Sequence, residues 1–153
     1  ELRCEPGRAL VDGAGMTLAR VEFRKLSAAG DRLVGLAMNR TQMRTAAAEA
    51  MFDPLLVRPA GSGEPSGAFE GYLVGAYCIE RELILQRRLV FGTGAAVGDI
   101  VAFPNTAGYF MHILESASHQ MPLAANVVVE DGLPGARDPI DGWLPETTAT
   151  LSR

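Results

Sequence analysis

The stretch TLARVEFRK, residues 17–25, decides the fold class that we expect for this chain. Along it the apolar side chains of Val21 and Phe23 alternate with charged ones. A period of two residues is typical of a strand that buries one of its faces. We therefore predict a half-buried strand over residues 17–25.

Short segments of the same kind recur along the chain, with turn-forming residues between them. Apolar or β-branched residues dominate DRLVGLAM (31–38), DPLLVRP (53–59), EGYLVGAYCI (70–79), LILQRRLVF (83–91), DIVAFP (99–104) and AANVVVED (124–131). No regular alternation of strands with helices appears, which argues against a doubly wound parallel sheet. We predict a mainly β fold, an antiparallel Greek-key barrel or sandwich.

Two segments favour short helices inserted between these strands. RTQMRTAAAEAMF (40–52) is rich in Ala, Met and Gln, and Asn39 could cap it by accepting a free backbone N–H of the first turn. TAGYFMHILESASHQ (106–120) has apolar residues near helical spacing. The helices are expected near residues 40–51 and 107–117.

Composition excludes several classes of function. The 153 residues carry a formal net charge of -4 with a pI near 5.2, which argues against nucleic-acid binding. No apolar run reaches membrane-spanning length, and the charged first residues do not suggest a signal peptide. Cys4 and Cys78 are too few for a disulfide framework, and no Cys/His cluster has zinc-ligand spacing. We expect reduced thiols, no metal, no membrane contact and a cytoplasmic location, with Cys4 packed rather than functional.

Four short motifs follow one another in a specific order: EPGR (5–8), GAYC (75–78), GD (98–99) and AGY (107–109). This series resembles the C-terminal part of the fold-type III pyridoxal-phosphate decarboxylases, the diaminopimelate and ornithine decarboxylase family, and places the chain in a divergent subgroup. The resemblance implies that residues 1–16 end a cofactor-binding barrel, that 17–131 form a C-terminal β-barrel domain and that 132–153 are a polar tail. The cofactor-binding lysine of the family would lie upstream, because Lys25, the one lysine here, matches no such motif.

The resemblance also implies cofactor contacts. Glu5 matches the carboxylate that keeps the pyridoxal-phosphate ring nitrogen protonated, and Gly7 and Arg8 match positions near the phosphate or the substrate carboxylate. Tyr109 matches a tyrosine whose hydroxyl binds the phosphate, although its motif is inverted here to Ala-Gly-Tyr. The alternatives are an ordinary Pro-Gly surface turn for EPGR and a helix-anchoring role for Tyr109.

Cys78 matches the family's catalytic thiol, which protonates the substrate carbon after CO2 leaves and reaches the site of the partner subunit. The alternative is a buried core thiol. Ile79 stands where the family has an acidic residue that holds the substrate's far amino group, so the nearest acids are Glu80 and Glu82. Arg44 lies one place from the family's substrate-binding arginine.

These matches predict the C-terminal domain of a pyridoxal-phosphate-dependent amino-acid decarboxylase. Full-length protein is expected to be a homodimer whose active site this domain completes, whereas the fragment alone is expected to be inactive. Two alternatives stay open: a non-catalytic binding or regulatory relative, favoured by Ile79, and an amino-acid racemase that uses Tyr77 in place of Cys78.

Overall fold

The computed structural model describes residues 2–7, 10–42, 52–107, 127–129 and 143–145. They belong to two compact units, residues 1–121 and 122–153. The second unit contains an antiparallel pair of short strands, β7 (Val127–Val129) and β8 (Trp143–Pro145). The predicted strand over residues 124–131 is confirmed at its centre by β7, whereas β8 lies in the stretch that we expected to be a tail.

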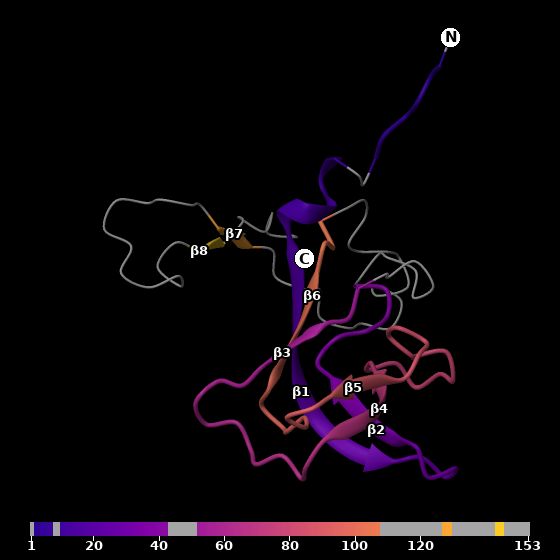
Figure 1. Ribbon diagram of the computed structural model, residues 1–153, viewed down its shortest axis with the longest axis vertical. Coiled ribbons are helices and arrows are strands. Elements are labelled where there is room, and N and C mark those ends of the chain that lie inside the picture. The colour runs from indigo at the N-terminus through magenta and orange to yellow at the C-terminus, as the bar shows by residue number, and fades with distance from the viewer. Residues whose placement is uncertain (1, 8–9, 43–51, 108–126, 130–142, 146–153) are drawn as a thin grey trace, which may run out of the picture. The chain divides into compact units, whose positions relative to one another are not determined.

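The first unit is a six-stranded mixed sheet that curls into a nearly closed barrel (Figure 1). Its strand order is β3-β6-β1-β2-β4-β5, so β3 and β5 form the two edges. The strands are β1 (Met16–Leu26), β2 (Arg32–Leu36), β3 (Leu55–Val57), β4 (Phe69–Val74), β5 (Leu89–Phe91) and β6 (Ile100–Pro104). The 3-10 helix η2 (Asp12–Ala14) precedes β1. The prediction of a mainly β domain is therefore confirmed.

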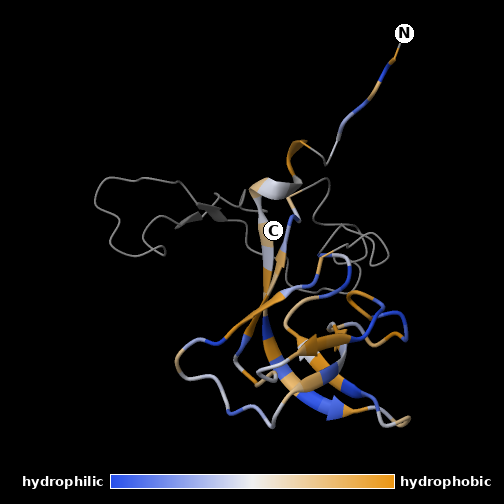
Figure 2. Ribbon diagram, in the orientation of Figure 1, coloured by the Kyte–Doolittle hydropathy of each residue, from blue (hydrophilic) through white to orange (hydrophobic). Residues whose placement is uncertain are grey.

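The strand β1 joins the two halves of the sheet (Figure 1). Its first half pairs with β6 up to Arg20, and from Val21 onward it pairs with β2. A register shift between Val21 and Phe23, of the kind produced by a β-bulge, marks the exchange of partners. The predicted alternation holds through Val21, but beyond the bulge Phe23 is 37% exposed. Figure 2 shows this second half of β1 as largely hydrophilic.

One strand pair departs from the predicted antiparallel arrangement: β2 and β4 run parallel. Parallel neighbours need a crossover connection, and residues 37–68 supply it because they leave β2, form β3 at the far edge and return. The predicted helices near 40–51 and 107–117 lie mostly outside the described residues. Within the described ranges there is no α-helix, and residues 40–42 form a turn.

The two strands expected over residues 70–79 and 83–91 are shorter than predicted. β4 ends at Val74, and β5 covers only the last three residues of the second segment. Residues 84–87 form bends rather than a strand, although Ile84 and Leu85 are both buried in the core. Gln86 has a φ of 51°, in the left-handed region. Core packing therefore overrides strand propensity here.

The core of this unit lies between the inner faces of the strands. Phe69 and Phe91 stack with ring centroids 5.9 Å apart across the β4–β5 pair. The largest apolar side chains with almost no exposed surface are Phe103, Leu73, Val21, Val34 and Val101. These residues come from β1, β2, β4 and β6, so the buried faces of the central strands hold the sheet together.

Asp99 of the Gly98-Asp99 motif forms an ion pair with Arg58 that links β3, an edge strand, to β6. Asp99 is fully buried, and its carboxylate accepts hydrogen bonds from Arg58 Nε at 3.0 Å, from Arg58 Nη2 at 2.9 Å and from the Ala96 N–H at 2.8 Å. Burial by itself would raise the pKa of Asp99, but the hydrogen bonds from Arg58 and Ala96 leave this pKa below its ordinary value. Because Arg58 directly follows β3 and Asp99 directly precedes β6, the pair joins the ends of these strands.

Candidate functional site

Cys78 lies in a loop, residues 75–82, that we call the Cys78 loop. The Gly75 N–H donates to the Glu82 carbonyl at 3.1 Å, and the Ala76 N–H donates to the Met38 carbonyl at 2.8 Å. The loop is thus closed at its base and attached to the chain that follows β2. The sequence placed Cys78 in a strand, which is wrong, because β4 ends before the loop begins.

The Cys78 thiol is exposed, so the alternative of a buried core thiol is wrong. It lines an open groove of about 390 Å³ together with Lys25, Tyr77, Ile79 and Glu80. Tyr77 is only 6% exposed, whereas Ile79 is 38% exposed. The Lys25 ammonium lies 5.2 Å from the centre of the Phe23 ring. A thiol in such a groove can meet a molecule that approaches from outside the barrel.

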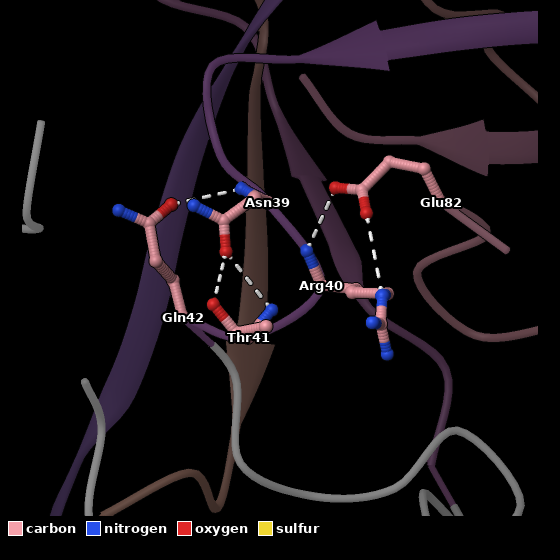
Figure 3. A network of polar contacts seen from close by, with 5 residues as sticks. All are labelled: Asn39, Arg40, Thr41, Gln42 and Glu82. Atoms are coloured by element: carbon pink, nitrogen blue, oxygen red, sulfur yellow. Dashed lines mark hydrogen bonds and ion pairs between the residues drawn. The ribbon is translucent and has the colours of Figure 1, made fainter. Parts of the chain in front are cut away.

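Glu82 connects the Cys78 loop to the turn at residues 39–42 (Figure 3). Its carboxylate is 4% exposed, and Oε1 accepts the backbone N–H of Arg40 at 2.9 Å. The second oxygen, Oε2, lies 3.7 Å from Arg40 Nε. Glu82 thus binds the backbone of its own chain, and it also lines the groove beside Cys78. A substrate contact at Glu82 stays a prediction. Arg40 was not recognised from the sequence.

Gly75 leaves the space that the Glu82 carboxylate occupies. A Cβ at position 75 would collide with Glu82 Oε1 and would lie 2.7 Å from the Met38 carbonyl oxygen. The carboxylate can rotate away, but the Met38 carbonyl belongs to the backbone that anchors the loop. Glycine at the start of the Cys78 loop is thus a packing requirement.

We expect Gly75→Ala to lower the free energy of unfolding by about 2 kcal/mol, because the added methyl group overpacks the base of the loop. The measurement is urea denaturation of the chain followed by circular dichroism. Gly92→Ala is the matched control: nothing lies within 4 Å of a Cβ built at Gly92, so its effect should stay within about 0.5 kcal/mol. If the two substitutions lowered the free energy of unfolding equally, the close contact at Gly75 would not be destabilising.

Asn39 has the geometry expected of a helix cap (Figure 3). Its Oδ1 accepts the Thr41 N–H at 2.9 Å, and Gln42 Oε1 accepts the Asn39 N–H at 2.8 Å. The first bond is typical of an N-cap, and the second is the one that the residue at the third position makes in a capping box. The segment 43–51 that would continue the helix lies outside the described residues. Asn39 is fully buried, and its Nδ2 has no hydrogen-bond partner among the described residues.

The remaining predicted site residues fall near the chain's first residues or outside the described ranges. Glu5 is exposed, and the Leu10 N–H donates to the Gly7 carbonyl at 3.0 Å. Glu5 does not line the Cys78 groove, so the structure does not bring these two candidates together. Arg8, Arg44 and Tyr109 lie outside the described residues.

Two further properties bear on the kind of site. Among the described residues, no group of three or more His, Cys, Asp or Glu side chains is placed to hold a metal ion. The described residues also contain no helix that is both long and apolar enough to span a membrane.

The comparisons with known proteins identify one relative by sequence. No protein-family model matches the chain. An uncharacterized protein of Sinorhizobium fredii, y4yA, is 32% identical over 134 residues, which cover 85% of this chain and 29% of that protein.

Several solved structures also resemble the chain, at lower sequence identity. The diaminopimelate decarboxylase of M. jannaschii, solved with L-lysine, matches with a TM-score of 0.60 and 20% identity over 83% of this chain and 27% of its own. That of Helicobacter pylori, also with L-lysine, matches with a TM-score of 0.60 and 20% identity over 84% and 30%. The arginine decarboxylase of Paramecium bursaria Chlorella virus, bound to agmatine, matches with a TM-score of 0.53 and 19% identity over 69% and 28%. The chain therefore has a fold that these decarboxylases contain, and it spans less than a third of the length of the proteins it matches.

Proposed function

We propose that this chain is the C-terminal β-domain of a pyridoxal-phosphate-dependent amino-acid decarboxylase of a divergent subgroup, with Cys78 as its catalytic acid. The observation that carries the proposal is the exposed Cys78 thiol in an open groove, on a fold shared with diaminopimelate and arginine decarboxylases. An acid must reach the atom that it protonates, and the exposed Cys78 thiol lines a groove that can hold a molecule, whereas Cys4 is exposed but does not line it.

We propose that the cofactor is held mainly by the rest of the protein and that this domain adds contacts to it. The carboxylate of Glu5 and the thiol of Cys78 are both exposed, so both are available to a group outside the core of this domain. When bound, pyridoxal phosphate supplies an electron sink for the bond that breaks. Glu5, Gly7, Arg8 and Tyr109 would contact it, and Cys78 would deliver a proton to the substrate carbon.

The partners of the full-length protein follow from the same site. Since the thiol faces outward, we propose a homodimer in which Cys78 completes the active site of the partner subunit, in a cytoplasmic enzyme. The substrate is an amino acid whose carboxylate Arg8 or Arg44 would bind. Ile79 offers no charge to a distal amino group, so Glu80 is the exposed acid of the loop that would contact a basic side chain.

A second candidate is a relative of the same fold that binds an amino acid without decarboxylating it. The half-exposed, apolar Ile79 in the Cys78 groove favours this candidate. A racemase that uses Tyr77 is less supported, because Cys78 is the more accessible of the two neighbours.

The proposed function is tested by expressing the full-length protein with pyridoxal phosphate and measuring CO2 release from a panel of amino acids. Basic, acidic and apolar substrates are included, and the handedness of the recovered amino acid is measured in parallel. We expect CO2 release from at least one substrate that depends on added cofactor. Inversion without CO2 release would support the racemase instead, and amino-acid binding without either reaction would support the non-catalytic relative.

A further inference from the structure

The Glu82 carboxylate is buried where the Cys78 loop meets the turn at residues 39–42. Placing a carboxylate away from water costs free energy unless hydrogen bonds or an opposite charge compensate it. Here the Arg40 backbone N–H and the Arg40 guanidinium supply both kinds of partner. The buried Glu82 carboxylate therefore holds the segments that it contacts in a fixed arrangement.

That position joins three points of the chain. Glu82 is the last residue of the Cys78 loop, its carboxylate fills the space beside Gly75 at the start of the loop, and Oε1 is bonded to Arg40. The Ala76 N–H bonded to the Met38 carbonyl adds a second link between the same two segments. Both ends of the loop are therefore attached to the chain that follows β2.

Cys78 lies near the middle of this loop, three residues from Gly75 and four from Glu82. The thiol itself is exposed, so its own packing does not determine where it lies. The location of the thiol follows from how the ends of the loop are held. By contrast Glu80, on the same loop, is exposed.

We propose that Glu82 is the positioning residue of Cys78. Its carboxylate clamps the Cys78 loop to the Arg40 backbone, so that the thiol is presented in the groove in one arrangement. The importance of this clamp for turnover rests on the proposed function, but the clamp itself can be tested without any reaction.

The test separates the reach of the Glu82 side chain from its charge. Glu82→Asp keeps the charge but is one methylene shorter, so its oxygens no longer reach the Arg40 N–H. Glu82→Gln loses the charge but keeps an acceptor oxygen at the same place. Both are made in a Cys4→Ala background of the whole chain, in which Cys78 is the only thiol because the sequence has two cysteines. Glu80→Gln is the matched control on the same loop.

Two quantities are measured: hydrogen exchange of the Arg40 and Ala76 amides by NMR, and the alkylation rate of Cys78 with iodoacetamide. We expect Glu82→Asp to speed exchange of both amides about tenfold and alkylation about threefold, because a released loop opens more often. Glu82→Gln should stay within about twofold of the parent in both quantities. Glu80→Gln should stay within about twofold of the parent in amide exchange. Exchange in the core strand amides of Val21 and Val101 should not change, which separates loop release from global unfolding.

The proposal is overturned if Glu82→Gln changes both quantities as much as Glu82→Asp, since charge rather than reach would then matter. It is also overturned if neither substitution changes them. Should Glu82→Asp fail to fold, Glu82→Ala, which removes both reach and charge, replaces it. Faster exchange and alkylation in Glu82→Ala than in Glu82→Gln would support the clamp, and equal values in the two variants would contradict it. A full-length protein without decarboxylase activity but with the expected pattern would refute the proposed function and leave the clamp standing.

Discussion

Cys78→Ala in the full-length protein is expected to lower the rate of decarboxylation by about two to four orders of magnitude, the usual contribution of a general acid. Cofactor binding should stay nearly intact, because the residues proposed to contact the cofactor lie elsewhere in the chain. The measurements are kcat from CO2 release and cofactor content from absorbance. Cys4→Ala is the matched control. The expectation that Cys4 is packed was wrong, because it is exposed as Cys78 is, but it does not line the groove.

The same substitution tests the proposed dimer. Cys78→Ala and Glu5→Ala subunits are each expected to be weakly active alone. Mixed dimers should regain part of the activity, because one of their two sites then combines an intact Glu5 from one subunit with an intact Cys78 from the other. No recovery on mixing would mean that each subunit uses its own thiol. An unchanged rate in Cys78→Ala would remove the thiol from the reaction, and the non-catalytic or Tyr77-based alternatives would then lead.

Asp99→Ala is expected to lower the free energy of unfolding by about 3 kcal/mol at neutral pH, because it leaves a charged Arg58 and the Ala96 N–H without their shared acceptor. The measurement is urea denaturation of the chain. Asp53→Ala is the matched control: Asp53 pairs with Arg87 at 2.9 Å but is 79% exposed, so its loss should cost about 0.5 kcal/mol. Equal effects at the two sites would contradict the role given to the buried pair.

The dependence on pH gives a second check of Asp99. Its pKa in the folded chain lies below the ordinary value of 3.8, so the folded state favours the ionised carboxylate. The stabilisation is therefore fully present above about pH 4 and is lost as the pH falls through the lowered pKa. The difference between the parent and Asp99→Ala should shrink below pH 3.8. A difference that grows with acidification would contradict the sign of this pKa shift.

The local patterns in the sequence were sufficient for the mainly β class of the fold and for most of its strands, but not for β8 or for the ends of β4 and β5. The alternation in residues 17–25 predicted β1, and the apolar run within residues 99–104 predicted β6, because side-chain period and turn residues are properties of neighbouring positions. Those patterns did not reveal where β1 changes partners, since the register shift between Val21 and Phe23 is decided by the two strands that pair with β1.

The candidate site, too, could be predicted from the sequence only in part. The motif around Cys78 is visible in the sequence, but its exposure is not, because an apolar stretch such as GAYCI is equally compatible with a buried strand. The contact between Glu82 and Arg40 joins residues 42 positions apart, and the Arg58–Asp99 pair joins residues 41 positions apart.

The sequence by itself thus determined a chain of short strands, the turns between them and the chemical groups that lie near one another along the backbone. The tertiary structure decided the parallel β2–β4 pair, the end of β4 before Cys78 and the burial of Glu82 and Asp99. The physical reason is that pairing direction and burial depend on which distant segments pack together. A carboxylate such as that of Glu82 is placed inside the protein only when a partner from another part of the chain compensates its lost hydration.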